Sequence, residues 1–224
     1  MLTAAQQTTD VTQSAFFGLM SKAKNILRWS LMSQFSQEKL DSHIYEVSVI
    51  GHLLGAIACD VFGEDVNPDY VASVAIFHEG GEVAGLADVN SLAKYHNPDI
   101  AKAMKTLESF FENKLLSSLP EALQDRYQPL IMQDRKDRHV QLAKFADILS
   151  AHNKCVFEVS KSNPEFAQAL AEKTALINKL CNEDPVMNYY CEHFLTLSNA
   201  SFDTQTHAVR DCNAADLLAI GEAR

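Results

Sequence analysis

The chain has 224 residues, of which 47% are hydrophobic and 21% are charged, a composition typical of a globular domain with a sizeable core. Its formal net charge of −10 argues against a nucleic-acid polymer as partner, because binding to a phosphate backbone requires clustered lysine and arginine. The five cysteines are scattered and form no CxxC pair, which excludes a zinc ribbon and argues against a disulfide framework.

The N-terminal stretch MLTAAQQTTDVTQ is polar and has no apolar segment of the kind found in signal peptides. We also expect no apolar run of membrane-spanning length. The sequence therefore predicts a cytoplasmic protein without a membrane partner.

The predicted elements are all helices, because apolar residues recur at helical spacing and no segment alternates as a strand would. The clearest helix lies within DSHIYEVSVIGHLLGAIACDVFG, where Asp41 or Ser42 can act as the N-cap and Gly63 as the stop. Asn-Pro pairs mark three later helix starts. In chain order, the expected helices are 15–27, 42–62, 68–79, 98–117, 120–132, 137–161, 164–181 and 185–198.

These elements predict an all-α fold, a single helical bundle of about seven or eight helices. We place the domain at residues 14–202, after a frayed N-terminus at 1–13 and before a C-terminal tail at 203–224.

Four ionisable residues lie on otherwise apolar helices. They are His43, His78 and Glu79 in VAIFHE, and Asp147 in LAKFADILSAHNK. Any one of them alone is more often a satisfied core residue than a ligand. Together, two imidazoles and two carboxylates from three helices suit a hydrated divalent metal ion.

Two further histidines have ordinary interpretations. We expect His52 to pack in the core and His152 to be a surface or helix-cap residue.

Five segments, in this order and in helical context, resemble the HD-domain metal-dependent phosphohydrolases. The likeness is greatest to the bacterial 5′-deoxynucleotidases of the YfbR type, and it runs from about Phe16 to about Leu197. The segments are ILRWSLM (26–32), DSHIYEVSVIGHLL (41–54), IFHEGGEV (76–83), AKYHN (93–97) and KFADILSAHNKC (144–155).

The resemblance implies an HD-type helical domain that forms a homodimer and hydrolyses nucleoside 5′-monophosphates, with one divalent metal ion as cofactor. By position, His43, His78 and Asp147 match the metal ligands of the family. Glu82 matches the glutamate that handles protons at the attacking water, and it shares a face with His78 if the helix persists between them.

The substrate-binding residues are also implied by position. Arg28 and Trp29 match an Arg-Trp pair in which the guanidinium orients the substrate phosphate. Asp88 lies near an aspartate that contacts substrate and assists catalysis, although GLADVNS has one more residue than the loop of the family. Ser91 would replace a threonine of that loop.

Glu79 is the main departure, because the family has a His-Asp dyad where this chain has His78-Glu79. The side chain is longer by one methylene, about 1.5 Å, whereas metal sites tolerate errors in ligand distance of about 0.2 Å. Either Glu79 binds the metal with altered geometry, helped by a bend at Gly80-Gly81, or the metal site is weakened.

Three functions follow from these patterns. The first is a metal-dependent phosphomonoesterase acting on deoxynucleoside 5′-monophosphates. The second is a catalytically weak or inactive relative that acts as a nucleotide-binding or regulatory protein. The third, a purely structural helical module, leaves the ionisable residues on apolar helices unexplained. A mixed nitrogen and oxygen ligand set accepts Co, Mn, Fe, Ni, Zn or Mg and does not fix the metal.

Overall fold

The structure, a computed structural model, describes residues 13–87 and 97–209, and within these ranges every regular element is a helix. This confirms the all-α class. Residues 202–209 are also helical, and the elements labelled η are short 3₁₀ or π-helical segments. The elements are α1 (Phe16–Met20), η1 (Ser21–Asn25), α2 (Leu40–Ala56), η2 (Ile57–Val61), α3 (Pro68–Phe77), η3 (Glu82–Leu86), α5 (Pro98–Ser117), α6 (Glu121–Ile131), α7 (Arg138–Ser160), η4 (Pro164–Phe166), α8 (Ala167–Glu183), α9 (Pro185–Tyr190), η5 (Cys191–Leu195) and α10 (Thr196–Ser198).

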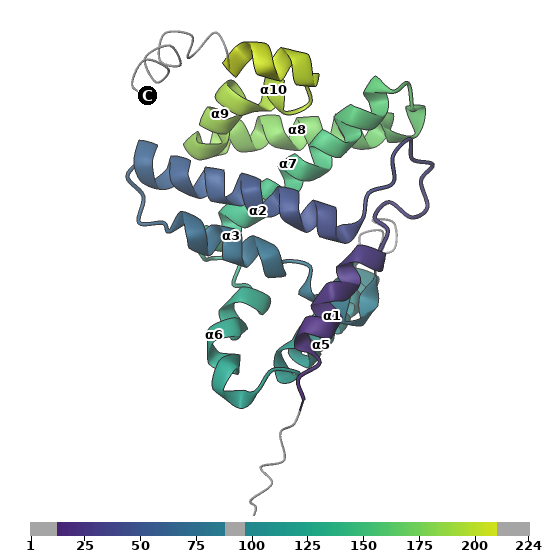
Figure 1. The fold of residues 1–224 in the computed structure, drawn as a ribbon, viewed down its shortest axis with the longest axis vertical. Coiled ribbons are helices and arrows are strands. Elements are labelled where there is room, and N and C mark those ends of the chain that lie inside the picture. The colour runs from purple at the N-terminus through teal and green to yellow at the C-terminus, as the bar shows by residue number, and fades with distance from the viewer. Residues whose placement is uncertain (1–12, 88–96, 210–224) are drawn as a thin grey trace, which may run out of the picture.

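Helix α2 is central to the fold and packs most extensively against α3 and α7 (Figure 1). Val47 and Leu54 of α2 are fully buried, as are Val71 of α3 and Ala146 and Leu149 of α7. Helical spacing places such residues on one stripe of each helix, so the three stripes meet in a common core. This packing also fixes the relative positions of polar side chains on the same helices.

A second, smaller core joins the N-terminal helices to α5 and α6, which form the lower part of the molecule in Figure 1. Its buried members are Ala23, Leu40, Val83, Leu115 and Ile131. Since Leu40 begins α2, this core holds the start of the central helix.

The predicted helix 68–79 ends earlier than expected, because α3 stops at Phe77 and His78 is its C-cap. The following glycines lie against α5. A Cβ on Gly81 would be 3.2 Å from Glu108 Cγ, and one on Gly85 would be 2.3 Å from Phe111 Cε1. Glycine therefore permits the close approach that brings this segment onto α5.

The N-cap of α2 also differs from the prediction. It is Lys39, and Asp41 and Ser42 lie in the first turn of the helix. The Leu40 backbone N–H donates to the Ile26 carbonyl at 3.0 Å, so a neighbouring segment satisfies a donor that a side-chain cap would otherwise take. Gly63 has φ +67°, which confirms the predicted stop.

Most of the other predicted boundaries agree with the structure within a few residues. Helices 98–117, 120–132 and 137–161 correspond to α5, α6 and α7. The predicted segments 15–27, 164–181 and 185–198 are each divided between α-helix and a 3₁₀ or π-helical segment of three to five residues. The domain limits stay a prediction, since 1–12 and 210–224 lie outside the described residues.

One expectation about membranes was wrong. Within the described residues, the helical segment Leu40–Val61 is long and apolar enough to span a membrane by length and composition. It is the central helix of the bundle, packed against α3 and α7.

The cysteines within the described residues are free thiols, as expected for a chain whose cysteine spacing argues against a disulfide framework. They are Cys59, Cys155, Cys181 and Cys191.

Candidate metal centre and active site

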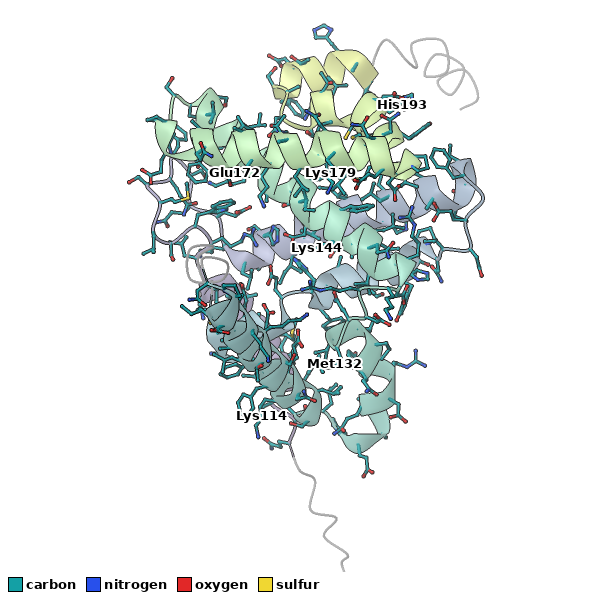
Figure 2. All side chains as sticks on the ribbon, turned by 180° about the vertical axis from the view of Figure 1, so that it is seen from behind. Lys114, Met132, Lys144, Glu172, Lys179 and His193 are labelled. Carbon is teal, nitrogen blue, oxygen red and sulfur yellow. The ribbon has the colours of Figure 1, made fainter. Side chains whose placement is uncertain are left out.

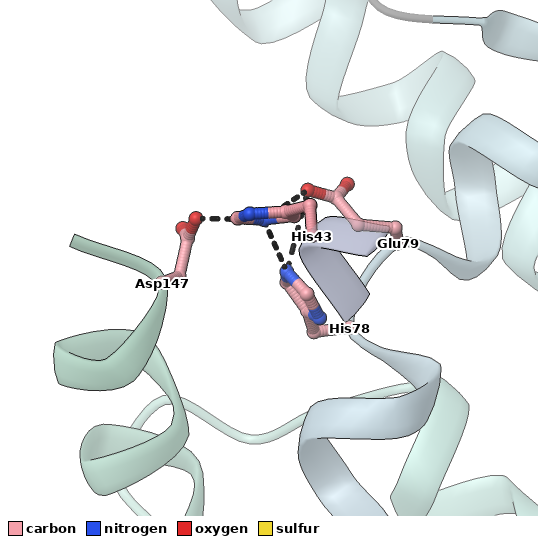
Figure 3. Close-up of side chains that lie close together, drawn as sticks. All are labelled: His43, His78, Glu79 and Asp147. Atoms are coloured by element: carbon pink, nitrogen blue, oxygen red, sulfur yellow. Dashed lines mark hydrogen bonds and ion pairs between the residues drawn. The ribbon is translucent and has the colours of Figure 1, made fainter. Parts of the chain in front are cut away.

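The four ionisable residues selected from the sequence come together at one point. His43 lies in the first turn of α2, His78 and Glu79 follow α3, and Asp147 lies in the middle of α7. Each offers one ligand atom, and these atoms all lie within 4.8 Å of one another (Figure 3). The site is thus built from the three helices that share the main core.

The ligand atoms face one another at short distances. His43 Nε2 lies 3.3 Å from His78 Nε2 and 3.3 Å from Asp147 Oδ1. Glu79 Oε1 lies 3.4 Å from His78 Nε2 and 3.8 Å from His43 Nε2. The imidazole of His43 is fully buried, whereas Asp147 keeps 15% of its side chain exposed.

The outer nitrogen of each imidazole already has a partner. His78 Nδ1 lies 2.6 Å from the Ala75 carbonyl oxygen, and His43 Nδ1 lies 3.0 Å from Ser150 Oγ. A carbonyl can only accept, so Nδ1 of His78 carries the hydrogen and Nε2 of the neutral ring is a bare acceptor.

This arrangement leaves acceptors facing acceptors at the centre of the site: an imidazole lone pair and the oxygens of two carboxylates. A cation satisfies such a set, and nitrogen and oxygen ligands of this kind suit a divalent metal ion. The residues present therefore fit the metal that the sequence predicts.

The electrostatics of the site favour ionised carboxylates. Burial would raise the pKa of Glu79, but the neighbouring His78 outweighs it and lowers that pKa. Burial likewise opposes ionisation of Asp147, yet Lys144 and His43 hold its pKa well below the usual range. The Lys144 ammonium forms an ion pair with Asp147 from the outer face of α7, which Figure 2 shows from behind.

The pKa values of the two histidines are shifted in opposite directions. Burial lowers the pKa of His43, although the nearby Asp147 carboxylate opposes this shift. For His78 burial acts the same way, but the Glu79 carboxylate prevails and the pKa is raised. That proton would lie on Nε2, the His78 atom that would bind a metal ion, so proton and metal would compete for it.

The longer side chain of Glu79 has a visible consequence. Its Oε1 approaches both imidazoles and also lies 3.4 Å from Arg28 Nη1. One carboxylate therefore joins the candidate metal ligands to the arginine expected to hold the substrate phosphate.

The predicted pair Arg28 and Trp29 is anchored by Glu38, which sequence reasoning missed. Glu38 Oε2 accepts from Arg28 Nε at 3.2 Å and from Trp29 Nε1 at 2.8 Å. Trp29 has φ +56°, a strained conformation for a bulky residue. Its ring lies 5.4 Å from that of Phe166 in an edge-on contact. The geometry of this pair is thus imposed by tertiary contacts.

Glu82 is buried, with 5% of its surface exposed, and it begins the π-helical segment η3. The condition for a shared helix face, a helix that continues from His78 to Glu82, is not met, because α3 ends at Phe77. The Glu82 backbone N–H nevertheless donates to the Glu79 carbonyl at 3.1 Å. A turn at His78 and Glu79, rather than a continuous helix, therefore connects Glu82 to the candidate ligands along the chain.

Asp88 and Ser91, predicted to contact substrate, lie outside the described residues. Sequence reasoning also missed Glu46 and Ser150, which lie behind His43. A signal for both was present, since each follows a candidate ligand by three residues, a spacing that shares a helix face.

The expectations for His52 and His152 were both wrong. His52 keeps 52% of its side chain exposed and pairs with Asp69, whereas His152 is buried. Neither contributes to the cluster of four ligands.

Known proteins are similar to this chain in sequence and in fold. The chain matches the 5′-deoxynucleotidase YfbR-like family over residues 15–197. A 5′-deoxynucleotidase from Vibrio vulnificus (strain YJ016) is 36% identical over 192 residues, covering 85% of this chain and 97% of the relative. The 5′-deoxynucleotidase YfbR of Escherichia coli O127:H6 is 35% identical over 192 residues, covering 85% and 95%.

A solved structure supports the fold. An HD-domain phosphohydrolase from Listeria innocua superposes with a TM-score of 0.71 at 20% identity, covering 85% of this chain and 91% of the other. These matches confirm the fold class and the resemblance that the sequence indicated.

Proposed function

Because this chain belongs to the 5′-deoxynucleotidase YfbR-like family, we propose that it is a metal-dependent phosphomonoesterase. It hydrolyses (deoxy)nucleoside 5′-monophosphates to a nucleoside and inorganic phosphate. The observation that carries this proposal is the convergence of four metal-ligand side chains within 4.8 Å, with Arg28 Nη1 only 3.4 Å from one of them.

In this proposal His43, His78, Glu79 and Asp147 hold one divalent ion, of Co, Mn, Fe, Ni, Zn or Mg. When bound, such an ion supplies Lewis-acid polarisation of a phosphate oxygen and lowers the pKa of water. The short separations among these four side chains support Glu79 as a working ligand.

The other residues bind substrate or move protons. The Arg28 guanidinium binds phosphate oxygens through its fork of donors, with Trp29 beside it. Glu82 takes the proton from the attacking water and returns one to the departing 5′ oxygen, assisted by Asp88. Asp88 and Ser91 contact the nucleotide.

One observation favours the alternative, a catalytically weak relative that binds nucleotides. The Glu79 carboxylate pairs with the Arg28 guanidinium at 3.4 Å, so substrate phosphate has to compete for this arginine. Phosphate binding would then be weaker than with a shorter carboxylate at this position.

The proposed partners are a nucleoside monophosphate and a second copy of the chain, in the cytoplasm. Tyr45 and Val49, which are 73% and 52% exposed, lie one turn apart on the outer face of α2 and offer an apolar stripe for a symmetric dimer. Light scattering on the wild type and on Tyr45→Asp tests this, with a dimer expected only for the wild type.

The decisive experiment measures metal content and phosphate release from dAMP for protein purified without chelator. The same measurements are made on Glu79→Asp, with Glu165→Asp as the matched control at an exposed site. About one divalent ion together with phosphate release supports the proposal. A metal-free, inert wild type that gains both properties in Glu79→Asp supports the alternative, and absence of metal from both contradicts the metal site.

A further inference from the structure

A chain of hydrogen bonds runs from His43 to the C-terminal helices. His43 Nδ1 lies 3.0 Å from Ser150 Oγ, and Ser150 Oγ donates to Glu46 Oε2 at 3.0 Å. Asn153 Nδ2 donates to the other oxygen, Glu46 Oε1, at 2.8 Å. Asn153 Oδ1 in turn accepts from Asn199 Nδ2 at 3.0 Å. These residues join α2, α7 and the end of α10.

The direction of each bond follows from its neighbours. The bond from Asn199 fixes the Asn153 amide with its oxygen outward, so its nitrogen faces Glu46 and donates. The carboxylate of Glu46 then accepts on both oxygens. Ser150 has a single hydrogen, which it gives to Glu46. What remains for His43 is a lone pair of Ser150 Oγ, so Nδ1 of His43 has to be the donor.

The burial of these groups strengthens the constraint. His43 and Ser150 are fully buried, and Asn153 is 8% exposed. A serine in the middle of a helix usually donates back to the carbonyl one turn earlier, but Ser150 turns its hydroxyl to a carboxylate on another helix.

We propose that Glu46, Ser150 and Asn153 form a relay that fixes His43 as the Nδ1–H tautomer, so that Nε2 presents its lone pair to the metal. The inference deepens the proposed function and rests on its metal site. Histidine ligands commonly donate their second N–H to a carboxylate or carbonyl. In this chain a hydroxyl lies between the imidazole and the carboxylate.

The relay makes a specific prediction for Glu46→Gln. With Asn153 still donating, the glutamine turns its oxygen to Asn153 and its NH₂ to Ser150. Ser150 then donates to His43 Nδ1, and the ring proton moves to Nε2, where it blocks the metal. We expect Glu46→Gln to bind Co²⁺ about 10- to 100-fold more weakly than the wild type does. We expect Ser150→Ala to bind it about 10-fold more weakly.

A second substitution should reverse the effect. In Glu46→Gln/Asn153→Asp the carboxylate at 153 accepts the amide of residue 46, whose carbonyl then faces Ser150 as the native carboxylate does. We expect Co²⁺ affinity to return to within about threefold of the wild type, because the two sites are coupled. A role in packing alone gives no such rescue.

The measurements are Co²⁺ affinity by calorimetry and the His43 tautomer by ¹⁵N NMR of the metal-free protein, with thermal unfolding to show that each variant folds. Ser48→Ala is the matched control, since Ser48 makes the ordinary bond to the Ile44 carbonyl at 2.7 Å. The proposal requires Nδ1–H in the wild type, Nε2–H in Glu46→Gln, and rescue in the double variant.

The relay is overturned if Glu46→Gln keeps the wild-type tautomer and affinity, or if the double variant binds Co²⁺ no better than Glu46→Gln. Should Glu46→Gln fail to fold, a wild-type affinity in Ser150→Ala overturns it equally. A wild type that binds Co²⁺ but releases no phosphate from dAMP contradicts the proposed function instead, and leaves the tautomer result standing.

Discussion

Two clusters of charged side chains each include a residue of helix α7, and they differ in the balance of hydrogen-bond donors and acceptors. At the start of α7 the Arg138 guanidinium donates to Glu64 at 2.7 and 2.9 Å and to Asp184 at 2.6 and 3.2 Å. In the middle of α7, Asp147 Oδ1 meets His43 Nε2 at 3.3 Å in a group where imidazole nitrogens and carboxylate oxygens face one another.

The difference separates a structural ion-pair network from a ligand site. Around Arg138 every carboxylate oxygen receives an N–H, so the network is complete by itself. Its hydrogen bonds with Glu64 raise the pKa of the arginine. The His43 cluster is rich in acceptors and poor in hydrogens, so it is completed by a cation. Counting donors against acceptors thus distinguishes the two more clearly than counting charges.

The largest expected effect comes from Asp147→Asn, which removes one of the two carboxylates while keeping the shape of the side chain. We expect metal binding and phosphate release from dAMP to fall by about 10³-fold or more, because the site loses a charge that offsets the ion. Thermal unfolding of the metal-free protein shows whether the variant folds. Asp125→Asn, at an exposed site, is the control, and a metal-loaded Asp147→Asn would show that the cluster is not the metal site.

Glu158, near the C-terminal end of α7, extends the comparison to pH. Its buried carboxylate accepts from the Phe35 backbone at 2.7 Å and from Asn163 at 2.8 Å, and pairs with Lys154 at 2.5 Å. Although burial opposes ionisation, these donors lower the pKa of Glu158 from 4.5 to about 2. A lowered pKa gives stability that is complete above about pH 4.5 and is lost as pH falls towards 2.

The shift corresponds to about 3 kcal/mol of unfolding free energy near neutral pH. Glu158→Gln should therefore be less stable than the wild type at pH 7, and the difference should shrink as the pH falls below about 4.5. Urea unfolding across pH 3–7 measures it, with the exposed Glu165→Gln as control. A difference independent of pH would mean that packing, and not charge, is what the substitution removes.

Arg138→Met tests the structural cluster directly. The side chain is 26% exposed, so solvent screens part of the interaction, and we expect a loss of about 1–3 kcal/mol in unfolding free energy. Activity per folded molecule should be unchanged, because the network has no atom in the candidate site. Arg126→Met, at an exposed position, should change stability by less than about 0.5 kcal/mol. Loss of metal affinity in Arg138→Met would remove the distinction between the two clusters.

The sequence predicted the parts of the fold that depend on local chemistry. Asn67 and Asn97 cap α3 and α5 by accepting two backbone N–H groups each, as an Asn-Pro pair indicates. The end of α3 was not predictable in the same way. It depends on how closely Gly81 and Gly85 approach α5, a tertiary contact that no local pattern encodes.

The candidate site likewise contains residues that the sequence indicates and residues that only tertiary contacts identify. His43, His78 and Asp147 stand out because ionisable residues interrupt apolar helices. Glu38 does not, since a glutamate near a helix start is usually a solvated residue. The spacing of Glu46 and Ser150 places them beside the ligands on their helices, but it does not indicate their bond to each other across 104 positions. His152 was misplaced because the middle of α7 is buried on several faces, so the helical period no longer marks an exposed side.

The smallest expected effect lies at the far end of the relay. Asn199→Ala removes the bond that orients the Asn153 amide. Ser198 Oγ lies 3.1 Å from Asn153 Oδ1 and 2.8 Å from the Leu195 carbonyl oxygen, so its single hydrogen can turn to Asn153 and keep the amide in its orientation. Since one neutral hydrogen bond contributes about 0.5–1.5 kcal/mol and its loss here is partly compensated, we expect Co²⁺ affinity to fall by less than about threefold. Calorimetry decides this: an effect as large as that of Ser150→Ala would mean that the C-terminal helices position α7 as a whole, and that His43 is not oriented bond by bond.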